Sequence, residues 1–337
     1  MKKVNIRELA QSLQLSASTV SKALKDSYEI SSKTKQRVQE AAARLNYTPN
    51  PYASSLKKKH SKTIAVIIPE IADNFFSLAI KGIQSVAETK GYHLLIYLSH
   101  EKFINEKLIV AECSSGRVDG ILISISEETI SPEHYLKLTS EKIPIVFFDR
   151  DFENLDIPKV ITNDYDCGYM AAQHLLERGC SNPVFLSVSS SLPICAKRAA
   201  GFAAALCAAG IMAEQKIISC TGNGDATVAE IRELLVSDHQ PDGIVASVER
   251  LAFQVYLVAQ ENGINIPDEI KVVAFSTVET APILNPSLTT ITQPAFQMGK
   301  AAVELLFKCI EKPGVDLSGT CIELPSKLII RNSSSGG

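Results

Sequence analysis

The chain has 337 residues, which is too long for one small domain, and its 45% hydrophobic and 21% charged residues exclude a disordered or fibrous protein. The longest uncharged apolar run, residues 199–213, is shorter than the ~20 residues that span a bilayer, and no export signal follows Met1. The eight cysteines form no C-x-x-C pair. We therefore expect reduced thiols in a cytoplasmic protein, with no metal site and no cofactor.

The net charge of −3 divides unevenly along the chain. Residues 1–62 carry 13 Lys and Arg against 4 Asp and Glu, a net charge of +9, whereas the other residues have a net charge of −12. A basic head on an acidic body indicates that the head alone binds a polyanion.

Three short helices are predicted in the basic head. Asn5 and Glu8 have the spacing of a capping box that opens the first helix, and Ser16 caps the second after a break at 14–15. The third begins near Ser31 and ends before Pro49. A tight break between the first two helices is typical of a helix-turn-helix unit.

In such a unit the second helix lies in the major groove of DNA. Ala17, Ser18 and Lys22 are predicted to project from its outer face, where Lys22 can donate to guanine. The hydroxyl side chains expected near phosphate oxygens are those of Ser16, Thr19, Ser21, Ser31 and Thr34. The alternative, a helical bundle for protein contacts, does not explain the charge of the head.

Residues 49–61 allow two interpretations. They could be a linker in which 57–59 is a solvated run of lysines. They could also form a short helix that presents Leu56 to the minor groove as a wedge between base steps. The residue pattern alone does not decide between them.

The head resembles the N-terminus of the lactose-repressor (LacI/GalR) family of bacterial regulators. The family's V-S/T-x-x-T-V-S-x-x-L motif is similar to Leu15–Leu24, and L-x-Y-x-P-N is similar to Leu45–Asn50. The A-x-S-L hinge motif matches Ala53–Leu56, although Ser54 replaces a frequent arginine, and Gln14 stands where the family usually has glycine. The resemblance implies DNA contacts by Asn5, Tyr47, Asn50, Ala53 and Leu56, in addition to the residues above.

The acidic body alternates apolar strands with amphipathic helices, which indicates parallel sheets with helices on both faces. The predicted strands are 64–68, 94–98, 120–123, 145–148, 184–188, 243–246 and 272–275. About 275 residues are too many for one such sheet, so two α/β lobes are expected.

Ligands of parallel sheets bind beyond the carboxyl ends of the strands. The candidate effector-binding residues near these ends are Phe75, Phe76, Ser124, Asp149, Arg198, Val248 and Ser276. Taken singly, each has a plain structural explanation as a core or surface residue. Together they suit a polyhydroxylated or anionic small molecule.

The body also resembles this family, for example in 143–150, 198–202 and 288–294, which are similar to P-V-V-F-x-D-R, R-x-x-G-F and L-T-T-V-x-Q-P. The resemblance implies a periplasmic-binding-protein-like α/β fold of two lobes, with an effector between them and crossovers near residues 162, 293 and 324. It also implies a homodimer.

The predicted organisation is a helix-turn-helix domain at 1–48, a hinge helix or linker at 49–61, an effector-binding and dimerisation core at 62–331 and a flexible tail at 332–337. Within the core, one lobe takes about 62–162 and 294–323, and the other takes about 163–293 and 324–331.

We therefore expect a homodimeric repressor that binds a pseudo-palindromic operator under the control of a sugar or related metabolite. Val248 and Ser276 stand where the family often has asparagine and aspartate. A neutral hexose is the first expectation for the effector, and a smaller, modified or anionic molecule paired with Arg198 is the alternative. No acid–base or nucleophile constellation is recognisable, and 222–225 is only half of a G-x-G-x-x-G fingerprint. A modifying enzyme and a receptor without DNA function are the alternatives.

Overall fold

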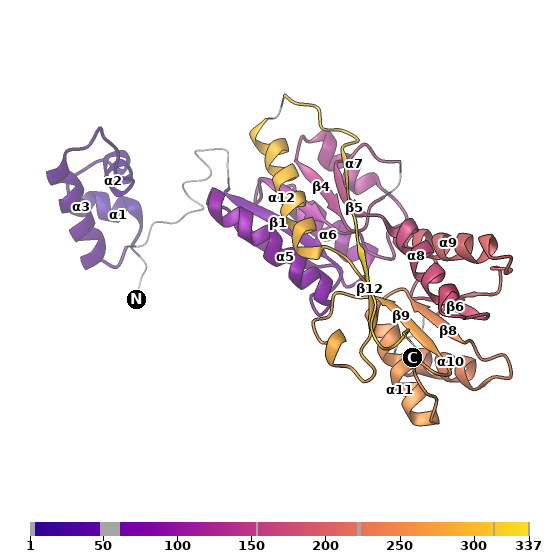
Figure 1. Cartoon of the computed structure of the whole chain (residues 1–337). Helices are drawn as coiled ribbons and strands as arrows, with labels where there is room; N and C mark the ends of the chain where they lie inside the picture. Colours follow the sequence, from indigo (N-terminus) through magenta and orange to yellow (C-terminus); the bar gives the residue numbers. More distant parts are fainter. Residues whose placement is uncertain (1–3, 48–60, 153, 221–223, 313, 336–337) are drawn as a thin grey trace. The chain divides into compact units, whose positions relative to one another are not determined.

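The computed structural model describes residues 4–47, 61–152, 154–220, 224–312 and 314–335. The chain divides into two compact units, Met1–Ser61 and Lys62–Gly337 (Figure 1). Each unit has a hydrophobic core of its own.

Within residues 4–47, the described part of the N-terminal unit, there are three helices, α1 (Ile6–Ser12), α2 (Ala17–Leu24) and α3 (Ser32–Arg44). Its core is formed by apolar residues from all three, among them the fully buried Leu9, Val20 and Val38. The capping box is present, because Asn5 Oδ1 accepts from the Glu8 amide at 3.0 Å and Glu8 Oε2 accepts from the Asn5 amide at 2.9 Å. The predicted helix-turn-helix fold is confirmed.

The turn between α1 and α2 has its one left-handed residue at Gln14, with φ of 55°. This conformation favours glycine, because a Cβ atom crowds the backbone there. The glycine typical of the family therefore has a physical reason, and this chain carries a strained glutamine in its place.

We expect Gln14→Gly to stabilise the N-terminal unit by about 0.5–1 kcal/mol, since relief of the left-handed strain exceeds the added entropy of the unfolded chain. Thermal unfolding of the unit, followed by circular dichroism, measures the change. Gln11→Gly, inside α1, is the matched control and should destabilise by about the same amount. A loss of stability in Gln14→Gly would show that the turn is not strained.

The C-terminal unit contains two six-stranded sheets. The first has the order β11-β5-β4-β3-β1-β2 and the second has the order β12-β10-β9-β8-β6-β7. All strand pairs are parallel except β10 with β12. We call the two halves the N-lobe and the C-lobe.

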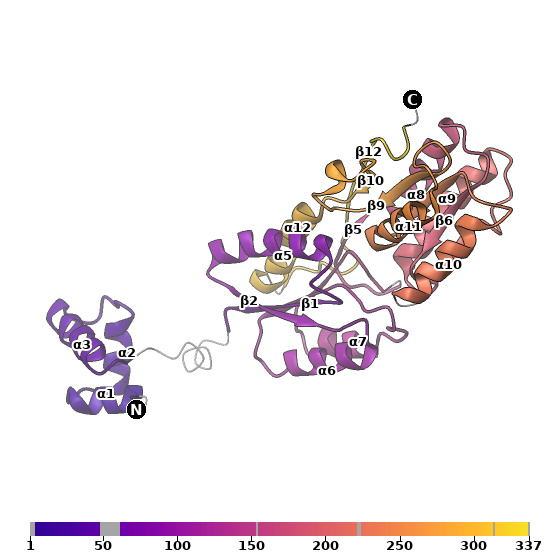
Figure 2. The same cartoon turned by 90° about the horizontal axis from the view of Figure 1, so that it is seen from below.

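The N-lobe strands are β1 (Thr63–Ile68), β2 (His93–Leu98), β3 (Gly120–Ile123), β4 (Ile145–Phe148), β5 (Lys159–Thr162) and β11 (Cys321–Leu324), and its helices are α5 (Asn74–Ala87), α6 (Phe103–Cys113), α7 (Glu133–Ser140) and α12 (Ala295–Glu311). Helices α5 and α12 cover one face of the sheet, and α6 and α7 cover the other (Figure 2). In strand β1, which lies between β2 and β3, Ile64 is paired with Leu94 on one side and with Gly120 on the other.

The C-lobe strands are β6 (Pro183–Ser187), β7 (Ile217–Ser219), β8 (Gly243–Ala246), β9 (Lys271–Phe275), β10 (Thr289–Thr292) and β12 (Lys327–Ile329), and its helices are α8 (Asp164–Glu177), α9 (Pro193–Ala208), α10 (Asp225–Val236) and α11 (Glu249–Asn262). Helices α8 and α9 pack on one face, and α10 and α11 pack on the other. The chain passes between the lobes after β5, after β10 and between β11 and β12.

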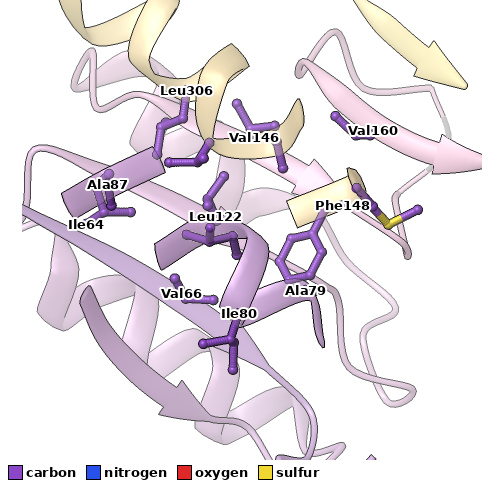
Figure 3. Close-up of a cluster of buried hydrophobic side chains, with 14 of the residues drawn as sticks. Ile64, Val66, Ala79, Ile80, Ala87, Leu122, Val146, Phe148, Val160 and Leu306 are labelled. Carbon is purple, nitrogen blue, oxygen red and sulfur yellow. The ribbon is translucent and has the colours of Figure 1, made fainter. Parts of the chain in front are cut away.

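The core between the N-lobe sheet and α5 and α12 is shown in Figure 3, where Val66, Leu122 and Val146 come from three adjacent strands. Leu306 of α12 closes it from the C-terminal part of the chain (Figure 3). The N-lobe is therefore complete only when residues far apart in the sequence meet.

Each lobe also contains a very close helix crossing. An added Cβ at Gly168 of α8 would lie 1.9 Å from the Arg198 carbonyl oxygen, and one at Gly201 of α9 would lie 1.9 Å from the Tyr165 carbonyl oxygen. Gly82 of α5 and Gly299 of α12 meet facing backbone atoms in the same way, at 2.1 and 2.0 Å. The glycine of the R-x-x-G-F motif is therefore required by backbone packing.

We expect Gly201→Ala to destabilise the C-terminal unit by about 1–3 kcal/mol, because the facing backbone must move to admit the methyl group. Urea unfolding measures the change. Gly314→Ala is the control, since an added Cβ meets nothing within 4 Å there. Equal stability of the two variants would contradict the close crossing.

The prediction of a flexible tail at 332–337 is wrong for the described part, 332–335. Ser333 and Ser334 are fully buried. Ser333 Oγ donates to the Val272 carbonyl at 2.6 Å, and Ser334 Oγ lies 2.7 Å from His174 Nε2. In the sequence a run of serines looks like a solvated chain end. In the structure these hydroxyls form hydrogen bonds with backbone and side-chain groups of the C-lobe.

Candidate DNA-binding surface and effector cavity

Four of the five hydroxyl groups predicted to bind phosphate lie at the starts of α2 and α3, and Ser21 lies within α2. Ser16 Oγ accepts from the Thr19 amide at 3.0 Å and lies 2.8 Å from the hydroxyl of Ser18. Ser31 caps α3 in the same way, with Thr34 as its partner. These hydroxyls therefore lie at helix N-termini, where backbone amides and the helix dipole also favour an anion.

The other predicted DNA contacts differ in exposure. Asn5, Ser18 and Lys22 are exposed, and Ser21 is half-buried. Ala17 and Tyr47 are also half-buried and pack against the core of the unit, so the surface that Ala17 can offer to DNA is only partial. The contacts predicted for Asn50, Ala53 and Leu56 lie outside the described residues.

Lys22 forms an exposed ion pair with Glu29, in the loop that precedes α3. An exposed pair of this kind contributes little to stability and is readily exchanged. Lys22 is therefore held on the surface of the head, where its ammonium group can exchange Glu29 for another acceptor.

A cavity opens between the two lobes, with about 530 Å³ of space including the solvent at its mouth. Its walls come from both lobes, at the strand ends where the sequence placed a ligand. The lining residues are Asp73, Phe75, Phe76, Asp149, Arg150, Val188, Leu192, Ile194, Cys195, Arg198, Val248, Glu249, Phe275, Ser276, Thr277 and Gln293.

Six of the seven predicted effector residues line this cavity, and Ser124 does not. Ser124 is fully buried behind Asp149, and its hydroxyl lies 3.5 Å from Asp149 Oδ2. The sequence prediction did not single out Asp73 and Gln293 as lining residues, and it named Glu249 only as part of a strand end. Asp73 lies in the same family-like motif as Phe75 and Phe76, so its position was a usable signal.

Asp149 lies at the centre of a tight turn directly after β4. The Arg150 amide donates to the Phe148 carbonyl at 2.7 Å, and Asp149 has a φ of 63°. Such a three-residue turn is strained, and strain of this kind concentrates at functional sites. The turn aims the Asp149 carboxyl group into the cavity.

The Asp149 carboxyl group is buried, and its contacts with hydrogen-bond donors of the protein are long. Its nearest hydrogen-bond donors, Ser124 Oγ and Gln293 Nε2, lie at 3.5 and 3.4 Å, and Arg150 Nε lies at 3.8 Å. Burial raises the pKa of Asp149 to about 7, although Arg150 and Arg198 oppose the shift. The cavity therefore destabilises a full negative charge at this position.

Arg198 is held by the C-lobe itself. Its Nε donates to Asp164 Oδ1 at 2.7 Å and its Nη1 donates to the Ser247 carbonyl at 2.8 Å. The guanidinium also stacks on Phe275, 4.1 Å from the ring centroid. Arg198 thus lines the cavity, and Asp164 already balances its positive charge. Asp164 and Phe275 together fix the plane of the Arg198 guanidinium group.

Contacts between the lobes occur at the rim of the cavity. The side-chain amide of Asn74 donates to the Thr277 carbonyl and lies 3.2 Å from the Thr277 hydroxyl. On another side, Lys197 of the C-lobe lies 3.8 Å from Asp151 of the N-lobe. These contacts join the lobes in the arrangement seen here.

No helix in the described ranges is long and apolar enough to cross a membrane. No group of three His, Cys, Asp or Glu side chains in those ranges is arranged to hold a metal ion.

Comparison with known proteins identifies the family. Residues 61–330 match the family described as periplasmic binding proteins and sugar binding domain of LacI family, and residues 5–50 match bacterial regulatory proteins, lacI family. The chain belongs to the LacI family. The resemblance of the head and body motifs to that family, and the predicted two-part fold, are confirmed.

Individual relatives cover most of the chain or nearly all of it. It is 30% identical to the ribose operon repressor of Halalkalibacterium halodurans, over 98% of this chain and 97% of that repressor. A Lac repressor dimer bound to operator and an anti-inducer has the same fold, with a TM-score of 0.86, 22% identity, and coverage of 99% and 100%. A LacI-family regulator from Enterococcus faecium with bound ribose has a TM-score of 0.72 and 25% identity, with coverage of 82% and 98%.

Proposed function

We propose that this protein is a cytoplasmic repressor whose affinity for an operator is controlled by a small molecule bound between the lobes. The observation that carries this proposal is the combination of a helix-turn-helix unit and an inter-lobe cavity in one chain. Neither a modifying enzyme nor a free receptor needs both parts.

The helix-turn-helix domain is assigned to residues 1–48 and the hinge to 49–61. One head presents a single recognition helix, so we infer that the chain acts as a homodimer on a pseudo-palindromic site. Ser18 and Lys22 would read bases, while the hydroxyls at the starts of α2 and α3 would bind phosphates. The Lac repressor dimer on its operator supports this arrangement.

The effector is assigned to the cavity of the core, residues 62–331. The stacking wall of Phe75 and Phe76, together with Asp149 and Arg198, suits a polyhydroxylated ring. The relative with bound ribose supports a sugar or sugar derivative as the ligand class. Such a ligand touches both lobes, so it favours one lobe arrangement and shifts the population that binds DNA.

Selection of binding sites from a random DNA library by the full chain tests the proposal. Inverted half-sites are expected, and Lys22→Ala should relax the base preference at one position in each half-site. The exposed Lys25→Ala is the control, which should weaken binding to all sequences alike. Enrichment of no DNA sequence would contradict the proposed function.

A further inference from the structure

The two guanidinium groups of the cavity are already balanced by carboxylates of their own. Arg150 Nη1 donates to both carboxylate oxygens of Glu101, each at 2.9 Å. Arg198 pairs with Asp164, which is itself 5% exposed. Each of these pairs is close to neutral, so neither offers an unpaired positive charge to a ligand.

Three further carboxyl groups line the same cavity, those of Asp73, Asp149 and Glu249. Asp73 and Asp149 belong to the N-lobe and Glu249 begins α11 of the C-lobe. Within the described residues, Asp73 and Glu249 make no ion pair, and Asp149 only shares Arg150 at 3.8 Å. The wall of the cavity therefore has an excess of acid over base.

Hydrogen bonds from neutral donors are a competing explanation for two of these acids. Asp73 Oδ1 accepts from the Phe75 amide at 2.8 Å as the N-cap of α5, and Glu249 Oε2, at the start of α11, accepts from the Ser276 hydroxyl at 2.6 Å. Such donors would stabilise the charged forms. Burial nevertheless raises the pKa of both acids, and the charge of Asp73 adds to the rise in the pKa of Glu249 and of Asp149. These hydrogen bonds leave the negative charge incompletely compensated.

We propose that the effector carries a positively charged amine on a polyhydroxylated frame, as an amino sugar does, with the amine between Asp73, Asp149 and Glu249. This inference rests on the proposed role of the cavity as the effector site. The amine supplies the missing countercharge and bridges acids from both lobes, so it favours the arrangement in which they face each other.

An anionic effector paired with Arg198, one of the two expectations from the sequence, does not fit this wall. Its charge would add to three carboxyl groups while Arg198 remains bound to Asp164 and Ser247. The hydroxyls of the frame can still lie against Phe75 and Phe76, which form a T-shaped pair with centroids 5.3 Å apart. The sugar-like part of the ligand is thus retained, and only its charge is specified.

Calorimetric titration of the full chain at pH 7 tests the inference with matched sets of ligands. Each set contains an amino sugar (glucosamine, galactosamine or mannosamine), its parent hexose, its N-acetyl form and the 6-phosphate of the hexose. At least one amine should bind about tenfold more tightly than its parent and its N-acetyl form, and the phosphates should bind most weakly. Tighter binding of a neutral or phosphorylated sugar, or binding of no amine, overturns the inference.

Substitutions locate the amine. Asp73→Asn and Glu249→Gln keep the shape of the wall, and each should reduce the preference for the amine over its parent hexose about five- to tenfold. Asp268→Asn, an exposed carboxyl group outside the cavity, is the control and should leave that preference unchanged. An unchanged preference in both cavity variants would overturn the placement.

Operator binding separates this inference from the proposed function. If a neutral sugar binds and changes operator affinity, the inference fails and the repressor assignment stands. If an amine binds as expected but operator affinity does not respond to any bound ligand, the regulatory role fails while the charge preference of the cavity remains.

Discussion

Removal of residues 1–61 is expected to abolish binding to operator DNA while leaving ligand binding by the body intact. The head contains the whole helix-turn-helix unit and the positive charge of the chain, whereas the body has a net charge of −12 over residues 63–337. An acidic body repels the phosphate backbone, so no residual affinity should remain. Gel-shift or fluorescence-anisotropy assays with a selected operator measure the loss.

The salt dependence of the full chain gives the matched measurement. Affinity for the operator should fall steeply and linearly on a log–log plot against salt, because each phosphate contact releases counterions. Ligand titration of the truncated body serves as the control that its fold is preserved. Retention of operator binding without the head would refute the assignment of DNA binding to the N-terminal unit.

The second large effect is expected at Arg198. Arg198→Ala leaves the Asp164 carboxylate buried without its cation, and we expect a loss of about 3–5 kcal/mol in the free energy of unfolding of the C-terminal unit. The same change removes a wall of the cavity, so ligand binding should be lost at temperatures where the variant is still folded. Urea unfolding and calorimetric titration measure the two losses separately.

Two variants show whether the buried pair is the cause. Arg232→Ala breaks a surface pair with Glu261, 2.6 Å apart and nearly half exposed on both sides, and should cost less than about 1 kcal/mol. Adding Asp164→Asn to Arg198→Ala removes the uncompensated charge and should restore part of the lost stability. If Arg198→Ala is as stable as Arg232→Ala, the buried pair does not hold α8 against α9.

The elements with strong local signals could be predicted from the sequence. The strands 120–123, 145–148 and 243–246 have the predicted bounds, because each is a continuous apolar run buried on both faces. The caps at Asn5, Ser16 and Ser31 were equally readable. In these places local chemistry and tertiary burial favour the same structure.

The strands that the sequence did not predict lack that agreement. β11 and β12 alternate between exposed and half-buried residues at the interlobe crossover, and β7 is a short edge strand with exposed ends. β10 is rich in threonine, so its burial depends on partners elsewhere, including the Arg331 carbonyl that accepts from Thr289 Oγ1. Non-local pairing of this kind leaves no pattern in the segment itself.

For the cavity, the sequence predicted which residues line it, but it did not predict how their charges are paired. Strand ends and motifs pointed to Asp149 and Arg198, and both line the cavity. The sequence could not show that Asp164, on another helix, neutralises Arg198. That pairing removes the free positive charge that an anionic ligand would need, and it arises where α8 and α9 cross at their glycines.

The C-terminal segments leave the ribosome last, which affects the order in which the parts of the protein can fold. Helix α12 and strand β11, which complete the N-lobe, and Ser333 and Ser334, which close the edge of the C-lobe, are made last. The three helices of the head share a core of their own and are made before the body, so the head can fold while the sensor is still incomplete. A translation product that stops before residue 295 would carry a finished DNA-binding head that no effector can regulate.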